Sequence, residues 1–343
     1  MYIENKRLNK YTSTWLLTMF LIISIMIIVG GLTRLTDSGL SITEWQLFSG
    51  ILPPFNESQW SKYFDLYKTI PEYKLQNYLM SIEEFKVIFW WEFIHRCLGR
   101  FIGIFFFLPL VFFSIKLGFI KTRRFFFIFF LICLQGFIGW YMVASGLVNR
   151  VDVSHYRLSL HLVLAFIILS LIFWSYLDLK KIKFISSNKI SKLPVIFLLL
   201  IFLQISIGAF VSGMDAGKIY NSWPLMGNNF FPDDNNFKNL FNLDAFNEPS
   251  LVQFMHRNLA YFIFIFYLLI LFNVHKNKIS LSYKITNIIG VLLFIQILLG
   301  ILTVISGVQI YLASMHQISS IFLLSSSIYF LYLNLPINLR PSN

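Results

Sequence analysis

Two histidines occur in nearly matching words, each where a long apolar stretch begins. His95 lies in "EFIHRCLGRFIGIFF", and His256 lies in "QFMHRNLAYFIFIFY" 161 residues later. A second matched pair follows at an offset of 155, with His161 in "YRLSLHLVLAF" and His316 in "YLASMHQISSI". Neutral imidazole is a good iron ligand, and two imidazoles facing each other across a helix gap suit the two axial positions of a haem. The pattern predicts two such pairs of histidines.

These residues also have other interpretations. A lone histidine near a membrane surface usually points its ring at the headgroups, but duplicated positions favour ligation. Zinc is the rival metal, although its structural sites favour closely spaced ligands or thiolates. Cys97 and Cys133 are expected at different depths, so we expect them to be inert and not to form a disulfide. We expect His275 to be solvated and His155 to have a structural or supporting role.

The surroundings of the two pairs differ in charge. Glu92, three residues before His95, has Gln253 as its counterpart, and both lie on the same helix face as their histidine. Arginines of the first half are replaced in the second: Arg34 by Ser212, Arg100 by Tyr261 and Arg157 by Leu312. Arginines at this level can pair with haem propionates, although snorkelling to headgroups is the alternative for each. The first half is therefore predicted to do chemistry, while the second holds a permanent haem that passes electrons.

The elements that position these residues are membrane spans. Of the 343 residues, 57% are hydrophobic and only 13% are charged, and apolar stretches of about 20 residues recur along the whole chain. We expect helices, because lipid offers no partner for an unpaired backbone group. The sequence predicts an all-α polytopic membrane protein with eight transmembrane helices at 15–33, 92–115, 125–146, 156–178, 193–213, 251–273, 285–306 and 312–335.

The net charge of +12 indicates topology and no nucleic-acid partner, because the basic residues cluster between alternate spans. These clusters are Lys6, Arg7 and Lys10; Lys116, Lys121, Arg123 and Arg124; Lys180, Lys181, Lys183, Lys189 and Lys192; and Lys276, Lys278 and Lys284. The positive-inside bias then places both termini in the cytoplasm and the histidines near the periplasmic side. We expect neither a transit peptide nor a removable signal, which fits a bacterial inner membrane.

An internal repeat organises the chain. Gly30, Asp37, Gly39, Trp45 and Pro54 match Gly208, Asp215, Gly217, Trp223 and Pro232 at an offset of 178, and Gln135 and Gly139 match Gln296 and Gly300 at 161. The repeat predicts two duplicated four-helix bundles, residues 1–185 and 186–343, related by a pseudo-twofold axis along the membrane normal. The long outer loop, 34–91, contains "QWSKYFDLYKTI", a predicted amphipathic helix on the membrane surface or capping the first bundle.

The words "GGLTRLTDSGLS", "EFKVIFWWEFIHRCLGR", "YRLSLHL", "NSWPLMG", "MHRNLAY" and "MHQ" together resemble haem A synthase, in its alphaproteobacterial and mitochondrial branch. The resemblance implies oxidation of a ring methyl of haem O to the formyl group of haem A, for cytochrome c oxidase. It implies a resident haem b on His256 and His316, substrate on His95 and His161, and a catalytic Glu92. The outer cysteine pair of other members is missing here.

On this basis the substrate haem O is expected to contact Arg34, Arg96, Arg100 and Arg157, and the resident haem Arg257. Expected partners are haem O synthase and the cytochrome c oxidase assembly machinery, and the sequence leaves self-association open. Two alternatives remain: a di-haem b-type electron carrier, for which Glu92 is incidental, and a module that delivers haem without transforming it.

Overall fold

The computed structural model describes residues 3, 5–44, 49–180 and 192–334, and this part of the chain is all-helical, as predicted. The long helices are α1 (Lys6–Leu35), α4 (Ile82–Leu117), α5 (Phe119–Asn149), α6 (His155–Leu179), α7 (Lys192–Gly213), α8 (Pro249–Lys276), α9 (Ser280–Ile305) and α10 (Ile310–Leu333). The shorter ones are α2 (Glu57–Tyr67), α3 (Pro71–Leu75) and the 3-10 turns η1 (Ser49–Ile51), η2 (Ala216–Lys218), η3 (Phe237–Phe241) and η4 (Leu243–Asn247). Trp45 of the repeat and the basic residues Lys181, Lys183 and Lys189 lie outside the described residues.

Seven of these helices are long and apolar enough to cross a membrane, so the chain is a multi-pass membrane protein. The exception among the long helices is α10, which coincides with the last predicted span. Six serines, together with His316 and Gln317, interrupt the apolar sequence of α10. It packs against α9, α7, α6 and α1, so much of its polar surface meets protein. The eighth crossing stays a prediction.

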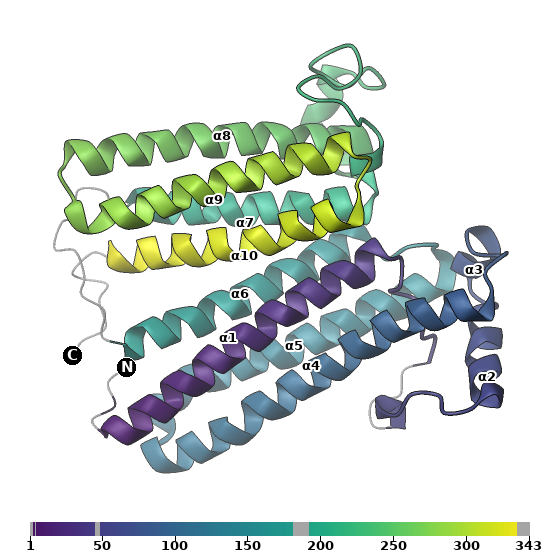
Figure 1. The fold of residues 1–343 in the computed structure, drawn as a ribbon, viewed down its shortest axis with the longest axis horizontal. Helices are drawn as coiled ribbons and strands as arrows, with labels where there is room; N and C mark the ends of the chain where they lie inside the picture. Colours follow the sequence, from purple (N-terminus) through teal and green to yellow (C-terminus); the bar gives the residue numbers. More distant parts are fainter. Residues whose placement is uncertain (1–2, 4, 45–48, 181–191, 335–343) are drawn as a thin grey trace.

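The long helices form two groups, each a closed ring of neighbours. In the first group α1 packs on α4, α4 on α5, α5 on α6 and α6 on α1; α7, α8, α9 and α10 form the second ring in the same way. Figure 1 shows the groups side by side, and they meet where α6 contacts α7 and α10 and where α1 contacts α10. The start of α1 and the end of α10 lie at one end, opposite α2 and α3 (Figure 1).

Helix α4 begins ten residues before the predicted span, because Ser81 and Glu84 form a capping box. The Ser81 hydroxyl accepts from the Glu84 backbone N–H at 3.3 Å, and the Glu84 carboxylate accepts from the Ser81 N–H at 2.8 Å. Its 36 residues, at about 1.5 Å each, span about 54 Å, well beyond a hydrocarbon core of roughly 30 Å. The first turns of α4 therefore project past the membrane and carry the outer segment.

The predicted amphipathic helix is α2, and it caps the first group of helices. Trp60 and Phe64 lie within 5.0 and 5.1 Å, centroid to centroid, of Phe89 and Phe85 on α4. These rings belong to an apolar outer cluster, separate from the main core, whose buried members are Leu40, Ile42, Trp60, Phe64, Tyr67, Ile70, Phe85, Ile88, Phe89 and Val153. The cluster fixes the outer segment on α4, and its member Phe89 lies one turn before Glu92.

A buried carboxyl lies at the edge of this outer cluster. Glu72 on α3 is only 3% exposed, and its Oε1 accepts a hydrogen bond from the Tyr67 hydroxyl at 3.0 Å. Asn77 donates to the Tyr67 oxygen at 2.8 Å. Burial raises the pKa of Glu72 to about 8, because the apolar surroundings disfavour the charged form.

Glu72→Gln is therefore expected to remove a pH dependence of stability. A raised pKa means that the folded state holds a proton that the unfolded state releases, so the stabilisation is complete below the unfolded pKa and is lost as pH rises through about 8. One pKa unit corresponds to about 1.4 kcal/mol. The melting temperature in detergent should fall between about pH 5 and about pH 8.5 for the wild type, and this fall should be absent from Glu72→Gln. Glu83→Gln, at an exposed site, is the control, and parallel pH responses of the wild type and Glu72→Gln would refute the expectation.

Candidate active site

The structure brings the four repeat-matched histidines together in two pairs, one in each helix group. His256 on α8 faces His316 on α10, with ring centroids 6.4 Å apart and planes inclined by 73°. His95 on α4 and His161 on α6 are close enough to interact electrostatically. All four side chains are half-buried and none is part of the packed core.

A glycine on the preceding long helix faces each of these histidines. A Cβ at that glycine would lie 2.9 to 3.0 Å from the histidine Cε1, closer than nearly all real Cβ contacts. The pairs are Gly30 with His95, Gly139 with His161, Gly208 with His256 and Gly300 with His316. The absent side chain lets each imidazole lie directly against its neighbouring helix, which fixes where the ring can point.

The His256–His316 pair fits a metal that brings its own additional ligands. Two nitrogen–metal bonds of about 2 Å and the half-widths of two imidazole rings add up to roughly 6 Å, close to the observed 6.4 Å. In the described residues no group of three or more His, Cys, Asp or Glu side chains could hold a metal. The buried Nδ1 atoms of His95, His161 and His256 also lack a hydrogen-bond partner in the protein. Paired imidazoles without further protein ligands suit a haem.

Glu92 lies one turn from His95 and is held on both sides. It is 3% exposed, and its Oε2 accepts hydrogen bonds from the Ser41 hydroxyl at 2.7 Å and the Ile42 N–H at 2.8 Å. Its Oε1 accepts from Arg96 Nε at 3.0 Å and from a terminal nitrogen at 2.6 Å. Arg96 also donates to the Ile42 carbonyl at 2.9 Å. Glu92 and Arg96 thus clamp the segment that follows α1.

The second helix group has the same clamp without the carboxylate. Arg257 donates to the Tyr220 carbonyl at 2.9 Å. Tyr220 is the counterpart of Ile42 in the repeat, at the offset of 178 residues. Gln253, in the place of Glu92, donates its amide to the same carbonyl at 3.0 Å. Arg257 further donates to the Ser222 carbonyl at 2.9 Å. The loop anchoring is therefore common to both groups, whereas the negative charge belongs to the first alone.

Arg34 has a different set of partners from the haem propionates that the sequence pattern predicts. From the end of α1 it pairs with Asp37 at 2.5 Å and Asp215 at 3.1 Å, approaches Asp152 to 3.9 Å, and donates to the Ser212 carbonyl at 2.9 Å. Burial raises the pKa of Asp152, and Arg34 partly offsets this effect. Because Ser212 and Asp215 lie at the end of α7 and just after it, Arg34 joins the two helix groups at their outer end.

The remaining sequence-predicted residues are two arginines, two histidines and two cysteines outside the histidine pairs. Arg157 on α6 bonds to the Ser145 hydroxyl and lies over the Tyr141 ring at 4.6 Å, while Arg100 is half-buried on α4, more than a turn beyond His95. His155 packs against Tyr156 and Phe210, and His275 stacks on Tyr283 at the opposite end of α8 from His256. Neither belongs to a histidine pair. Both cysteines are free thiols.

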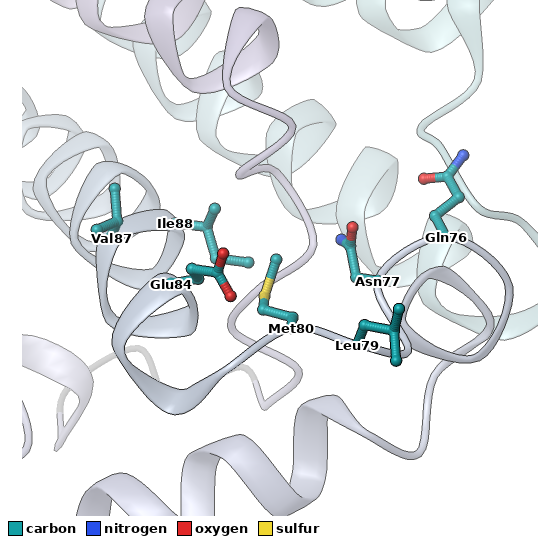
Figure 2. Close-up of a pocket in the computed structure, with 7 residues that line it drawn as sticks. All are labelled: Gln76, Asn77, Leu79, Met80, Glu84, Val87 and Ile88. Atoms are coloured by element: carbon teal, nitrogen blue, oxygen red, sulfur yellow. The ribbon is translucent and has the colours of Figure 1, made fainter.

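A surface groove of about 460 Å³ lies at the outer start of α4 and does not coincide with the histidines. Figure 2 shows its lining, which consists of Gln76, Asn77, Leu79, Met80, Glu84, Val87 and Ile88. The groove opens between the first turns of α4 and the segment that follows α3. It is therefore part of the outer segment, and the candidate site remains the space between the paired helices.

Comparisons with known proteins agree with this picture. A family model described as cytochrome oxidase assembly protein, COX15-CtaA, matches residues 13–328. A protein of Pelagibacter ubique named heme A synthase is 52% identical over 339 residues, which cover 97% of this chain and 99% of that protein. Proteins of the same name from Rickettsia bellii and Rickettsia prowazekii are 45% and 41% identical, each over 93% of this chain and 96% and 97% of their own lengths. The chain therefore belongs to the COX15-CtaA family of cytochrome oxidase assembly proteins.

Proposed function

We propose that this protein is a haem A synthase, an oxidoreductase that converts a ring methyl of haem O to the formyl group of haem A. The observation that carries the proposal is its similarity, over nearly the full length of both chains, to proteins named heme A synthase. Two matching clamps, of which only the first contains a carboxylate, support a division between a reacting and a non-reacting site. A di-haem electron carrier would need the four histidines but not this difference.

The proposed architecture has eight spans in two duplicated four-helix bundles, residues 1–185 and 186–343, about a pseudo-twofold axis along the membrane normal. Features beyond the sequence repeat support it. Asp37 and Asp215, related by 178 residues, both have left-handed backbone angles with φ of 47° and 51°. Arg96 and Arg257 reach equivalent carbonyls at the same distance. α10 would be the eighth span, protected from lipid by its contacts with four other helices.

In this proposal His256 and His316 hold the resident haem b, and His95 and His161 hold the substrate haem O. A haem b between His256 and His316 would supply one-electron transfer. His316 Nδ1 lies 3.0 Å from the Gln296 backbone carbonyl, which can only accept, so a proton on Nδ1 would be bonded there and Nε2 would be left for iron once the Gln296 amide, 3.4 Å away, gives way. This arrangement supports a permanent ligand in the second pair.

Glu92 is the proposed catalytic residue, next to the substrate pair. Replacing a methyl by a formyl group breaks two C–H bonds and adds an oxygen atom from water, so protons and electrons must leave. A carboxylate here can accept such a proton or stabilise positive charge that develops beside it. Arg96 and the Ser41–Ile42 segment keep it in one position. Pre-positioning reduces the reorganisation required during the reaction.

The arginines have two proposed roles. Arg100 and Arg157, absent from the second group, remain candidate partners for the propionates of haem O, and Arg96 and Arg257 can serve both as loop anchors and as propionate partners of the substrate and resident haem. Arg34 is surrounded by three carboxylates, with which a propionate would compete. We therefore assign Arg34 primarily to the contact between the two groups.

The proposed location is the bacterial inner membrane, with both termini cytoplasmic and the histidine pairs near the periplasmic side. Figure 1 shows the end of α4, the start of α5 and the end of α8 at the same end as the start of α1. These helix ends contain the basic residues Lys116, Lys121 and Lys276, as this orientation requires. The farnesyl tail of haem O favours lateral entry from the bilayer. Haem O synthase and the oxidase assembly machinery are the proposed partners.

Chromatography of extracted haems tests the function. Host cells that lack haem A should express a haem O synthase with or without this protein. A haem A peak, with haem O depleted, is expected only when the protein is present. Unchanged haem O beside a folded, haem-loaded protein would instead indicate the electron carrier, and exchangeable haem without product would indicate a delivery module.

A further inference from the structure

A short motif recurs on the helix that faces each histidine. A glutamine precedes the facing glycine by four residues in Gln135–Gly139 on α5, Gln204–Gly208 on α7 and Gln296–Gly300 on α9. On α1 the equivalent of this glutamine is Met26, four residues before Gly30. All four helix pairs thus share the glycine contact with a histidine. Three of them also have the glutamine, and the pair of α1 and α4 has Met26 in its place.

The three glutamines share one contact, and Gln204 and Gln296 also approach the ring nitrogens of His256 and His316 at 3.3 Å. The side-chain amide of Gln135 donates to the His161 backbone carbonyl at 2.9 Å, and Gln204 and Gln296 donate to the carbonyls of His256 and His316 at 3.0 Å each. Each bond joins two helices at the turn that carries the histidine. In a membrane protein such an interhelical hydrogen bond stabilises the contact between helices.

Met26 cannot make this contact, because a thioether has no hydrogen to donate. It packs instead against α4 near Gly99, where a Cβ would lie 3.5 Å from its Cε. Methionine is flexible and adapts to changing surroundings. The turn of α4 that carries His95 therefore lacks, from this position on α1, the polar tie that the other three histidine turns have.

We propose that Gln135, Gln204 and Gln296 are positioning residues that fix their histidines, and that Met26 makes His95 the ligand that releases and rebinds iron during exchange of substrate for product. The inference rests on the proposed haem ligands. In the resident pair, which must keep its haem, both histidine carbonyls accept a hydrogen bond from a glutamine. In the substrate pair, which must admit one haem and release another, only His161 has this bond, and the flexible Met26 lies on the helix facing His95.

The test exchanges the two residue types in the full-length protein purified in detergent with its haem. Haem loss is followed as transfer to excess apomyoglobin, and the axial ligands are monitored by electron paramagnetic resonance of the oxidised haem. Gln204→Met is expected to speed loss of the resident haem by roughly tenfold or more, as for other groups that orient a metal ligand, and to shift the low-spin signal. Met26→Gln, loaded with added haem, should slow loss from the first pair.

Tyr267→Phe is the matched control, because the Tyr267 hydroxyl on α8 also donates between helices, to the Thr286 carbonyl at 3.2 Å, but about three turns from His256. A rate and signal for Gln204→Met equal to those of Tyr267→Phe would overturn the inference. If Met26→Gln loses haem from the first pair as fast as the wild type does, the proposed role of Met26 is wrong. His256→Ala separates the two levels: if that variant keeps its haem, the ligand assignment itself is wrong; if it loses haem while Gln204→Met behaves like the control, only this inference fails.

Discussion

Glu92→Gln is expected to lower haem A formation by at least about a hundredfold, the lower range for loss of a proton-transferring group, while the fold and the resident haem are kept. The amide oxygen can still accept from the Ser41 hydroxyl and the Ile42 N–H, and in the second group the neutral Gln253 holds the equivalent segment by donating to the Tyr220 carbonyl. Arg96 retains its bond to the Ile42 carbonyl. The substitution therefore removes the negative charge and leaves an anchored loop. Haem extraction, together with the haem b spectrum of the purified variant, measures both effects.

The natural control is Gln253→Glu, which adds a carboxylate to the second clamp. It should leave haem A output nearly unchanged, because the reacting methyl is proposed to lie in the first group. Equal output from wild type and Glu92→Gln would remove Glu92 from the chemistry and favour a purely anchoring role. Loss of the resident haem from Glu92→Gln would point to a general folding defect instead.

The internal repeat is sufficient to predict the histidine pairs, because duplication marks the residues that both halves need. Eight long helices of the described residues coincide in order with the predicted spans, and seven of them are long and apolar enough to cross a membrane. The asymmetry between Glu92 and Gln253 can also be read from the sequence. The structure adds that both residues hold the segment after the preceding long helix, which no spacing argument could establish because the partners Ser41 and Ile42 are 50 residues or more away.

Other features depend on contacts between distant residues. The repeat alone suggests a haem propionate for Arg34, but Asp152 and Asp215 belong to segments whose position follows only from the packing of α6 and α7. The early start of α4 has a local signal, the Ser81–Glu84 capping box, which hydropathy does not register. Gln204 has a signal too: "QISIG" repeats the spacing of "QGFIG" and "QILLG". Comparison of the two halves pairs Gln135 with Gln296, but Gln204 joins this motif only when single helices are compared.

His256→Ala is expected to strip the purified protein of most of its haem, whereas His95→Ala should leave the b-type spectrum largely present. In the second pair His256 and His316 face each other at 6.4 Å, and each turn is tied by a glutamine. Removing one ligand there would leave the proposed resident haem held by a single histidine. In the first pair the proposed haem is substrate, so its loss would not change the resident content. Haem-to-protein ratios and optical spectra measure the difference.

His275→Ala is the matched control, since His275 lies on the same helix as His256 but at the opposite end, stacked on Tyr283. It should keep both haem content and haem A output. Equal haem loss from His95→Ala and His256→Ala would contradict the division of labour and favour two equivalent haems, as in an electron carrier. The unequal result, combined with loss of product from His95→Ala, would separate a site that turns over from a site that retains its cofactor. Because the two clamps and the four glycine contacts are otherwise alike, that separation must then come from the few positions where the halves differ, with Glu92 and Met26 foremost among them.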